Sequence, residues 1–148
     1  MRGMIAGGAG FIGSHLSRAL LERGDDVVCI DDLSTGNLDN ISDLLADPRF
    51  EFIRADVAHA PAVQVDVIAH LASPASPVDY ERMPIHTLQA NSLGMYRLLD
   101  VAAATGARLL FVSTSEVYGD PLVHPQPESY WGNVDPVGPR SCYDEAKR

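Results

Sequence analysis

The sequence predicts an α/β fold built on a doubly wound parallel sheet. Short apolar segments of strand length alternate along the chain with longer segments in which apolar residues recur at helical spacing. Strands that alternate with helices in this way form parallel sheets covered by helices on both faces. A glycine-rich turn joins the first predicted strand to the first predicted helix, and 148 residues are enough for one domain with a substantial core.

The first half of the chain contains three predicted strands. Residues 4–6 form a short apolar strand that ends at glycine, and the helix over 12–22 follows it with the apolar spacing of one helical face. Gly24 stands just past that helix, where a capping glycine is common. The other elements predicted here are a strand over 27–31, a polar loop over 32–37, a weak helix near 38–45 and a strand over 50–54.

The second half continues the alternation. We expect a strand over 66–72, a long helix over 84–104 and another buried strand over 109–113. The segment 114–139 contains five of the ten prolines. It is too long to be a plain connector, and loops of this length in a compact domain are usually functional. A helix that includes residues 143–147 is predicted last.

The composition narrows the class of protein. Hydrophobic residues make up 46% of the chain, as in soluble globular proteins, and no apolar run approaches the roughly 20 residues of a membrane span. The formal charge of -9 argues against nucleic acid as a partner. Cys29 and Cys142 lack metal-ligand spacing and the histidines are not clustered. We therefore expect no metal site and a cytoplasmic protein with reduced thiols.

The segment GGAGFIG, residues 7–13, has the glycine spacing of a dinucleotide-binding turn. Gly8, Gly10 and Gly13 fit Gly-x-Gly-x-x-Gly, and Gly7 begins a second register of the same motif. Glycines permit a tight turn and let backbone N–H groups approach a pyrophosphate at the start of the next helix. Asp31 follows about 20 residues later, as such sites require. A carboxylate there accepts from ribose hydroxyls and repels a 2′-phosphate, so the sequence predicts NAD rather than NADP.

Further cofactor contacts are predicted next to the glycine turn and at the carboxyl ends of the strands, where the ligand crevice of such a sheet lies. The complete predicted set in these segments is Gly7, Gly10, Phe11, Ile12, Asp31, Asp32, Thr35, Gly36, Asp56, Val57 and Leu71. Leu71 fits plain core packing equally well.

Tyr143 and Lys147 are four residues apart and therefore share one face of a helix. An ammonium beside a phenol lowers the pKa of the phenol, so the tyrosine can act as a base near neutral pH. Taken alone, the pair also fits an ordinary surface helix. Thr114, Ser115 and Glu116 follow a predicted strand and add hydroxyl and acid groups, which favours a catalytic site.

These motifs carry a family resemblance. In order, GGAGFIGSHL, DDLSTG, HLASPASPVDY, STSEVYGDP and the Tyr-x-x-x-Lys helix resemble the extended short-chain dehydrogenases. More narrowly, HLASPASPVDY and the segment 115–148 resemble UDP-glucuronate decarboxylases, and the resemblance covers essentially the whole chain. The sequence departs from that family at Ala6, Asp32, Asp135 and Ala146, where Thr, Asn, Asn and Gly are usual.

The resemblance implies an NAD-dependent decarboxylase that converts UDP-glucuronate to UDP-xylose. Tyr143 would take the proton of the 4-hydroxyl, while Lys147 would lower the pKa of Tyr143 and hold the nicotinamide ribose, so that both residues contact NAD. Thr114 and Ser115 would donate to the oxygen on carbon 4. Glu116 would assist decarboxylation or return a proton to carbon 5. The implied substrate contacts are Pro74, Tyr80, Asn91 and Arg140.

Other functions stay open on the sequence. A UDP-sugar 4-epimerase or a 4,6-dehydratase belongs to the same superfamily, although an epimerase more often has a small residue at the position of Glu116 and a dehydratase an acidic pair. A non-catalytic NAD-binding module also fits the glycine motif. Such a module has no need of Tyr143 and Lys147.

Residues 1–148 are predicted to form one NAD-binding Rossmann-like domain, truncated at its C-terminus because the sequence ends inside the helix of Lys147. The resemblance implies a small substrate domain beyond that point. It also implies a homodimer formed by the 84–104 helix and the helix near Tyr143. Apolar residues on more than one side of the first of these helices fit such an interface: Leu88, Leu93, Met95, Leu98, Leu99 and Val101.

Overall fold

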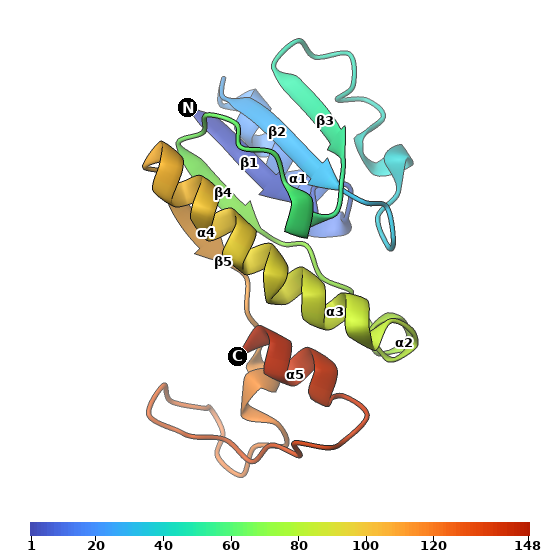
Figure 1. The fold of residues 1–148 in the computed structure, drawn as a ribbon, viewed down its shortest axis with the longest axis vertical. Coiled ribbons are helices and arrows are strands. Elements are labelled where there is room, and N and C mark those ends of the chain that lie inside the picture. Colours follow the sequence, from blue (N-terminus) through green and yellow to red (C-terminus); the bar gives the residue numbers. More distant parts are fainter.

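A five-stranded parallel sheet forms the centre of the protein. The computed structural model describes residues 1 to 148, and the strand order is β3-β2-β1-β4-β5 (Figure 1). All four pairings are parallel, so the predicted doubly wound α/β fold is confirmed. The chain builds outward from β1 in one direction and then crosses over to β4, which places the ligand-binding switch point beside β1. The strands are β1 (Arg2–Ala6), β2 (Asp26–Asp31), β3 (Phe50–Arg54), β4 (Val67–His70) and β5 (Arg108–Phe111).

Helices cover both faces of the sheet. α1 (Phe11–Glu22) lies on one face, and α4 (Leu93–Thr105) crosses the other face (Figure 1). Gly24, with a φ of 92°, follows the last residues of α1 as the sequence predicted. The remaining helices are α2 (Pro77–Arg82), α3 (Pro84–Asn91) and α5 (Ser141–Lys147), and the 3₁₀ turns are η1 (Leu38–Ile41), η2 (Val57–His59) and η3 (Ser115–Tyr118).

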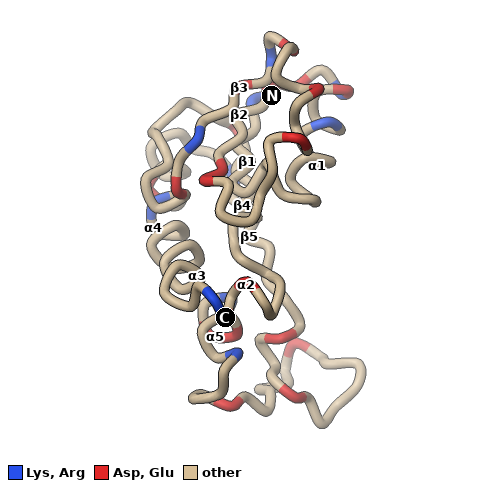
Figure 2. The backbone as a smooth tube through the Cα atoms, turned by 90° about the vertical axis from the view of Figure 1, so that its right-hand side faces the viewer, with Lys and Arg blue, Asp and Glu red and all other residues tan.

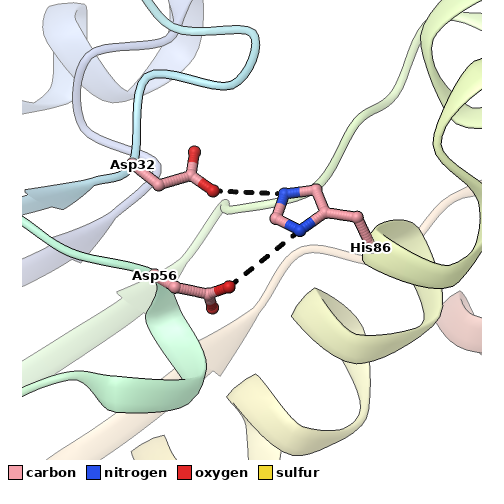
Figure 3. Close-up of side chains that lie close together, drawn as sticks. All are labelled: Asp32, Asp56 and His86. Carbon is pink, nitrogen blue, oxygen red and sulfur yellow. Dashed lines mark ion pairs between the residues drawn. The ribbon is translucent and has the colours of Figure 1, made fainter.

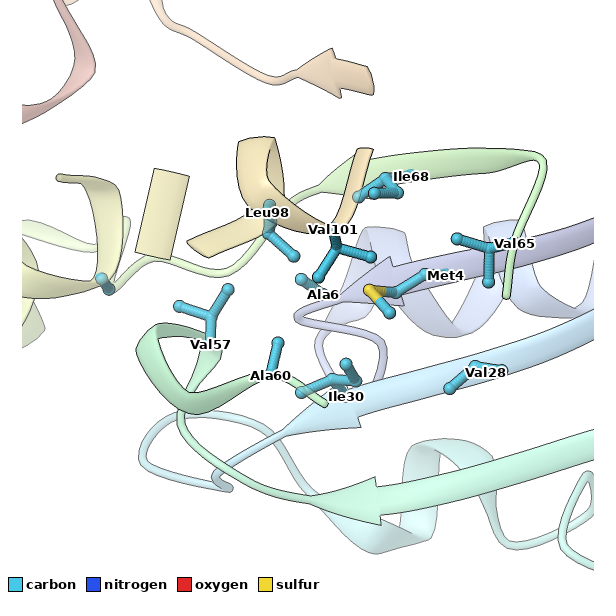
Figure 4. Packing of buried hydrophobic residues seen from close by; sticks show 11 residues of the cluster. Met4, Ala6, Val28, Ile30, Val57, Ala60, Val65, Ile68, Leu98 and Val101 are labelled. Atoms are coloured by element: carbon cyan, nitrogen blue, oxygen red, sulfur yellow. The ribbon is translucent and has the colours of Figure 1, made fainter. Parts of the chain in front are cut away.

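The core follows from the two-residue period of the strands. Met4 belongs to a buried cluster with Leu98 of α4, whereas its neighbour Ile5 belongs to a second cluster with Leu20 of α1. Successive residues of a strand point to opposite faces of the sheet. A strand that is apolar throughout therefore contributes side chains to the buried clusters on both faces. Figure 4 shows the α4 side, whose buried members are Met4, Ala6, Val28, Ile30, Val57, Ala60, Val65, Ile68, Ala90, Leu98 and Val101.

The last helix lies away from the sheet. α5 packs against α3 and η3, and with the long loop before it extends beyond the ends of the strands (Figures 1 and 2). Two hydrogen bonds tie it to the segment after β5. Lys147 Nζ donates to the Val112 carbonyl at 2.8 Å, and Ser113 Oγ donates to the Lys147 carbonyl at 3.0 Å.

The predicted long helix over 84–104 is wrong in one respect, because it divides at Ser92 into α3 and α4. Ser92 has ψ of -69°, and its Oγ donates to the Leu88 carbonyl, a bond that bends helices. Just beyond the break, an added Cβ at Gly94 would lie 2.6 Å from Val57, so η2 and α4 approach closely there. The sequence also did not predict α2.

The weak helix predicted near 38–45 is reduced to the turn η1. Beyond it, the Leu44 N–H bonds the Ile41 carbonyl and the Asp47 N–H bonds the Leu44 carbonyl. Each of these hydrogen bonds joins residues three apart and closes a single turn. The turns do not form a longer helix, because runs of 3₁₀ geometry are usually short. The predicted strands over 66–72 and 109–113 are shorter, at β4 and β5. No helix has the length and apolar character needed to cross a membrane.

The contrast between two leucines tests the core. Leu98 is 0% exposed between α4 and the sheet, whereas Leu122 is 79% exposed in the long loop. Leu98→Ala should lower the free energy of unfolding by about 2–5 kcal/mol, because it leaves a cavity in the core. Leu122→Ala should change that free energy by less than about 0.5 kcal/mol. Urea denaturation of both variants measures the difference, and equal stability losses would contradict this account of the core.

Candidate functional site

The glycine turn between β1 and α1 is shaped by close backbone contacts. Gly7 has a φ of 83°, and a Cβ there would lie 2.6 Å from the Ala72 backbone nitrogen after β4. A Cβ on Gly13 would collide with the Gly7 carbonyl oxygen. Both positions therefore require glycine. The turn ends at the start of α1, and the first N–H groups of a helix have no partner within it and can bind an anion.

Asp31 lies at the end of β2 and anchors the neighbouring loops. It is 8% exposed, and its carboxylate accepts hydrogen bonds from the Ala9 N–H at 3.0 Å and the Leu33 N–H at 2.8 Å. Burial raises the pKa of Asp31, while these two backbone bonds oppose the rise. Gly36 approaches so closely that a Cβ there would lie 2.7 Å from Asp31 Oδ1. The carboxylate is thus fixed in place with lone pairs left for a ligand.

A cleft opens beside Asp31, along the carboxyl ends of β1 to β4. It contains most of the predicted cofactor contacts: Gly7, Gly10, Asp31, Asp32, Thr35, Gly36, Asp56, Val57 and Leu71. Pro74, predicted as a substrate contact, also lines it. Phe11 and Ile12 are not in the lining and are 78% and 60% exposed. Tyr143 and Lys147 lie outside it as well.

His86 is a residue of this cleft that the sequence did not predict. Its Nε2 lies 3.2 Å from Asp32 Oδ2 and its Nδ1 lies 3.9 Å from Asp56 Oδ2, so the ring bridges the segments after β2 and β3 (Figure 3). The two carboxylates face different ring nitrogens, whereas a metal ion would be held by only one of them. The arrangement therefore suits an imidazole bridge. No spacing in the sequence links His86 to either aspartate.

A second cluster surrounds the start of α5. Tyr143 is 6% exposed and stacks on Tyr80, with ring centroids 4.8 Å apart and planes 6° apart. Tyr80 is itself 0% exposed, and its hydroxyl has no hydrogen-bond partner. Asn91 is buried, and its Nδ2 donates to Ser73 Oγ at 2.8 Å. Since Ser73 lines the cleft, Asn91 ties α3 to the cleft, and α3 in turn packs on α5.

The predicted effect of Lys147 on Tyr143 is not found. Burial raises the pKa of Tyr143, and the opposing influence is a hydrogen bond with Thr114 rather than the charge of Lys147. The Lys147 ammonium instead donates to the Val112 carbonyl and lies 4.9 Å from the centroid of the Phe111 ring. Burial lowers the pKa of Lys147 to about 8. Burial shifts the pKa values of Tyr143 and Lys147 in opposite directions because desolvation disfavours the charged form, which is the phenolate of Tyr143 and the ammonium of Lys147.

Glu116 and Arg140 form an ion pair at the rim of this second cluster. Glu116 lies in η3. Its backbone N–H donates a hydrogen bond to Thr114 Oγ1 at 3.3 Å. Ser115 is exposed beside it. The geometry therefore brings an acid and a guanidinium to the side of the buried tyrosine. This combination can exchange protons and can hold an anionic group.

The family follows from comparison with known proteins. Residues 4–148 match the GDP-mannose 4,6 dehydratase family over nearly the whole chain. The chain belongs to this family. It is 54% identical over 148 residues to UDP-glucuronic acid decarboxylase 1 of Arabidopsis thaliana, and it covers 34% of that protein. UDP-glucuronic acid decarboxylase 1 of Xenopus tropicalis is 52% identical over 145 residues, with 98% of this chain and 34% of the relative covered.

Several solved structures of other proteins share the fold of this chain. A dTDP-glucose 4,6-dehydratase from Streptomyces venezuelae with NAD bound superposes with a TM-score of 0.82 at 33% identity, covering 99% of this chain and 48% of that one. A UDP-galactose 4-epimerase gives 0.81 at 34% identity, with the same coverage. The chain thus spans about a third of the length of these two relatives and about half of the length of the two solved neighbours.

The buried Lys147 predicts an unusual pH dependence of stability. Its folded pKa of about 8 lies below the ordinary 10.5, so the folded state binds fewer protons between these values and stability rises with pH there. The charged form costs the fold at most about 3 kcal/mol, fully present below pH 8. Lys147→Met removes this cost. The stability of the variant relative to the parent should therefore be greatest near pH 7 and should decline toward pH 10.

Urea denaturation at pH 7 and pH 10 measures this difference. Arg148→Met is the matched control, because Arg148 is exposed on the same helix end. A Lys147→Met difference that stays constant over this range would refute the depressed pKa.

Proposed function

We propose that the protein is an NAD-dependent decarboxylase of UDP-glucuronate that forms UDP-xylose, with residues 1–148 as its cofactor-binding domain and a smaller substrate domain outside this chain. One observation carries the proposal. The Glu116–Arg140 ion pair and the buried Tyr143 lie together in a chain that is 52% to 54% identical, over nearly its whole length, to proteins named UDP-glucuronic acid decarboxylases.

The cleft suits NAD in shape and charge. Gly7 lets the turn pack closely on the backbone after β4, and the glycine spacing of the turn suits a pyrophosphate at the start of α1. Asp31 is held where a ribose hydroxyl would donate to it. Its lining includes no lysine or arginine that would favour a 2′-phosphate. NAD bound there would supply the acceptor and later donor of the hydride at carbon 4. Tyr143 and Lys147 would approach its nicotinamide end.

The residues of the second cluster would handle the protons of this reaction. Tyr143 would accept the proton of the 4-hydroxyl, and Thr114 and Ser115 would donate to the oxygen that remains. Tyr143 has a raised pKa in this structure. Its action as a base therefore depends on positive charge brought near it, from Lys147 or from the bound cofactor.

Glu116 and Arg140 would act on carbon 5. A ketone on carbon 4 makes the carboxylate on carbon 5 that of a β-keto acid, so carbon dioxide leaves and the electron pair passes into an enolate. Arg140 supplies positive charge for the substrate carboxylate, and Glu116 manages the proton that returns to carbon 5. Pro74, Tyr80 and Asn91 would shape the sugar side. Tyr80 is completely buried and stacks on Tyr143, so it would act through the position it gives Tyr143.

The alternatives are weaker on specific grounds. A 4-epimerase and a 4,6-dehydratase have the same fold, but the solved examples are 33% to 34% identical, against 54% for the decarboxylase. An NAD-binding module without catalysis would not need the Glu116–Arg140 pair. A cytoplasmic location is proposed from the two unpaired cysteines, Cys29 and Cys142.

We also propose that the full-length protein is a homodimer formed through α3, α4 and α5. Leu98 and Val101 of α4 are buried against the sheet. A row of apolar side chains on the other side of α3 and α4 stays exposed, by 37% to 72%: Ile85, Leu88, Tyr96 and Leu99. An apolar row of this kind is typical of a surface covered by a second copy.

Loss of the acid tests the reaction. In the full-length protein, Glu116→Gln should lower turnover of UDP-glucuronate by roughly 100-fold or more, because a proton donor is lost. NAD affinity should stay nearly unchanged, since Glu116 does not line the cleft. Tyr143→Phe should abolish the initial oxidation as well. Carbon dioxide release and UDP-xylose formation are the measurements.

Glu128→Gln is the matched control, because Glu128 is exposed in the same loop. A Glu116→Gln variant that decarboxylates at the parent rate would show that this mechanism is wrong. A parent protein that only epimerises carbon 4 would favour the alternative function.

Cofactor choice tests the cleft. NAD should bind at least about 10-fold more tightly than NADP, because a 2′-phosphate would meet Asp31 and Asp32 without a cation to offset them. Calorimetric titration with each dinucleotide measures the ratio. Equal or tighter binding of NADP would contradict the assignment.

Charge on the exposed row tests the dimer. Tyr96→Glu and Leu99→Glu should convert a dimer to a monomer at micromolar concentration, because each places a carboxylate in an apolar interface. Light scattering measures the mass. Trp131→Glu serves as the control, since Trp131 is 95% exposed in the long loop. A parent that is monomeric at the same concentration would rule out the homodimer.

A further inference from the structure

Asp144 is a buried acid next to the proposed base. It occupies the first turn of α5, directly after Tyr143, and is only 7% exposed. Its Oδ1 is buried and receives no hydrogen bond from any donor. The residue also lines a surface hollow together with Arg140 and Ser141. A carboxylate in such a place is costly unless a proton or a donor satisfies it.

Glu116 belongs to η3, which packs against α5, and its Oε2 is buried like Asp144 Oδ1. A side-chain hydrogen bond with Glu116 is among the causes that raise the pKa of Asp144. Arg140 pairs with Glu116, and its positive charge also lowers the pKa of Asp144. Two neighbouring carboxylates repel each other, and two acceptors cannot hydrogen-bond unless one of them holds a proton. A single proton between them supplies the missing donor for Asp144. It also leaves the group of three, with Arg140, without net charge.

The other charges around Asp144 do not remove the need for that proton. Burial is the main cause that raises the pKa of Asp144, Arg140 opposes it, and Glu116 and then Glu145 raise it further. The hollow adds Asp120 and Asp135. Of the helices packed on α5, α3 has no ionisable residue other than His86, which lies beside Asp32 at the cleft. α2 contributes Asp79, Glu81 and Arg82, of which Arg82 pairs with Asp79.

We propose that Asp144 and Glu116 share one proton, and that Asp144 is a positioning residue that keeps this proton available for Glu116 to deliver to carbon 5 of the substrate. The inference rests on the proposed function and adds a residue to it. It also explains how an anionic substrate can approach Glu116. A carboxylate on carbon 5 would be repelled by two ionised acids but not by a pair that holds one proton beside Arg140.

The proton balance of the reaction requires such a donor. When the bond between carbon 5 and the carboxylate breaks, its electron pair enters the enolate and carbon dioxide leaves without a proton. A carbon–hydrogen bond then forms at carbon 5 with the proton of the shared pair. The pair is left with two negative charges next to Arg140, and it regains one proton from solvent through the hollow before the next turnover.

This arrangement could not be identified by sequence spacing. Glu116 belongs to η3 after β5, whereas Asp144 belongs to α5, and the long loop separates them. A 4,6-dehydratase typically has an acidic pair at the position of Glu116, as stated in the sequence analysis. Here two acids are brought together from two segments, beside a tyrosine on the same helix as one of them.

Single-turnover kinetics of the full-length protein, with enzyme in excess over UDP-glucuronate, test the role of Asp144. Asp144→Asn should release carbon dioxide at close to the parent rate but form UDP-xylose at least about 10-fold more slowly near pH 7.5, because delivery of the proton is impaired. The deficit should shrink at lower pH, where solvent supplies the proton. Glu145→Gln, an exposed acid on the same helix, should match the parent in both rates.

Infrared difference spectroscopy tests the shared proton without catalysis. At neutral pH the parent should show a protonated carboxyl band that is lost in Asp144→Asn and in Glu116→Gln but retained in Glu145→Gln. The contribution of the buried Asp31 is common to all four proteins and cancels in the difference. If no band is lost, the shared proton is refuted, whatever the activity.

The kinetic outcomes separate the two proposals. If the parent forms UDP-xylose and Asp144→Asn shows parent rates, or slows carbon dioxide release and UDP-xylose formation equally, the role of Asp144 is overturned while the proposed function stands. If the parent forms no UDP-xylose, the proposed function fails and the role at carbon 5 fails with it. The spectra then still decide whether the two acids share a proton.

Discussion

The parallel pairing of five strands is the constraint on which the site depends. Because all strands point the same way, their carboxyl ends meet along one edge of the sheet. The glycine turn after β1, Asp31 at the end of β2, and Asp56 after β3 therefore lie around one cleft although they are far apart in the sequence. The reversal of strand order beside β1 opens the crevice in which a ligand fits. Any break in this pairing would separate all of these groups at once.

A second constraint is the cost of burying polar groups away from the sheet. The cluster at α5 is held in place by contacts with α3 and by two hydrogen bonds to the segment after β5. Within it, Tyr143 and Lys147 are both held in their neutral forms more strongly than in water, since burial moves the two pKa values in opposite directions. The cluster is consequently an environment in which added or shared charge has large effects. That property links the buried Asp144 to the proton chemistry proposed for Glu116.

His86 and Asp144 show how the two regions are completed by residues of the helical layer. His86 reaches from α3 to the carboxylates after β2 and β3, and Asn91 of the same helix bonds Ser73 at the cleft. α3 also packs on α5. One short helix thus contacts both the cofactor cleft and the acid cluster, so changes in its position would alter both. The break at Ser92 separates this helix from α4, which is fixed in the core by Leu98 and Val101.

The local pattern of the sequence was sufficient for the fold class and for the cleft. Strand alternation, glycine spacing and the position of Asp31 are short-range features, and they predicted the parallel sheet and nine of the cleft residues, from Gly7 to Leu71. Solvent exposure of Phe11 and Ile12 was not predictable, because helical periodicity does not show which residues at the start of α1 lie beyond the sheet. The division of the 84–104 helix depended on a serine bond and on the close approach of η2, which is a tertiary contact.

The sequence by itself determined that Tyr143 and Lys147 share a helix, since that follows from spacing alone. Only the tertiary structure decided what surrounds them. It placed Lys147 against Val112 and Phe111, stacked Tyr143 on Tyr80, and moved the pKa of Tyr143 upward instead of downward. It also brought Asp144 to Glu116 and His86 to Asp32 from separate elements. The physical reason is that pKa values and ion pairs are set by burial and by neighbours distant in sequence, which no local pattern encodes.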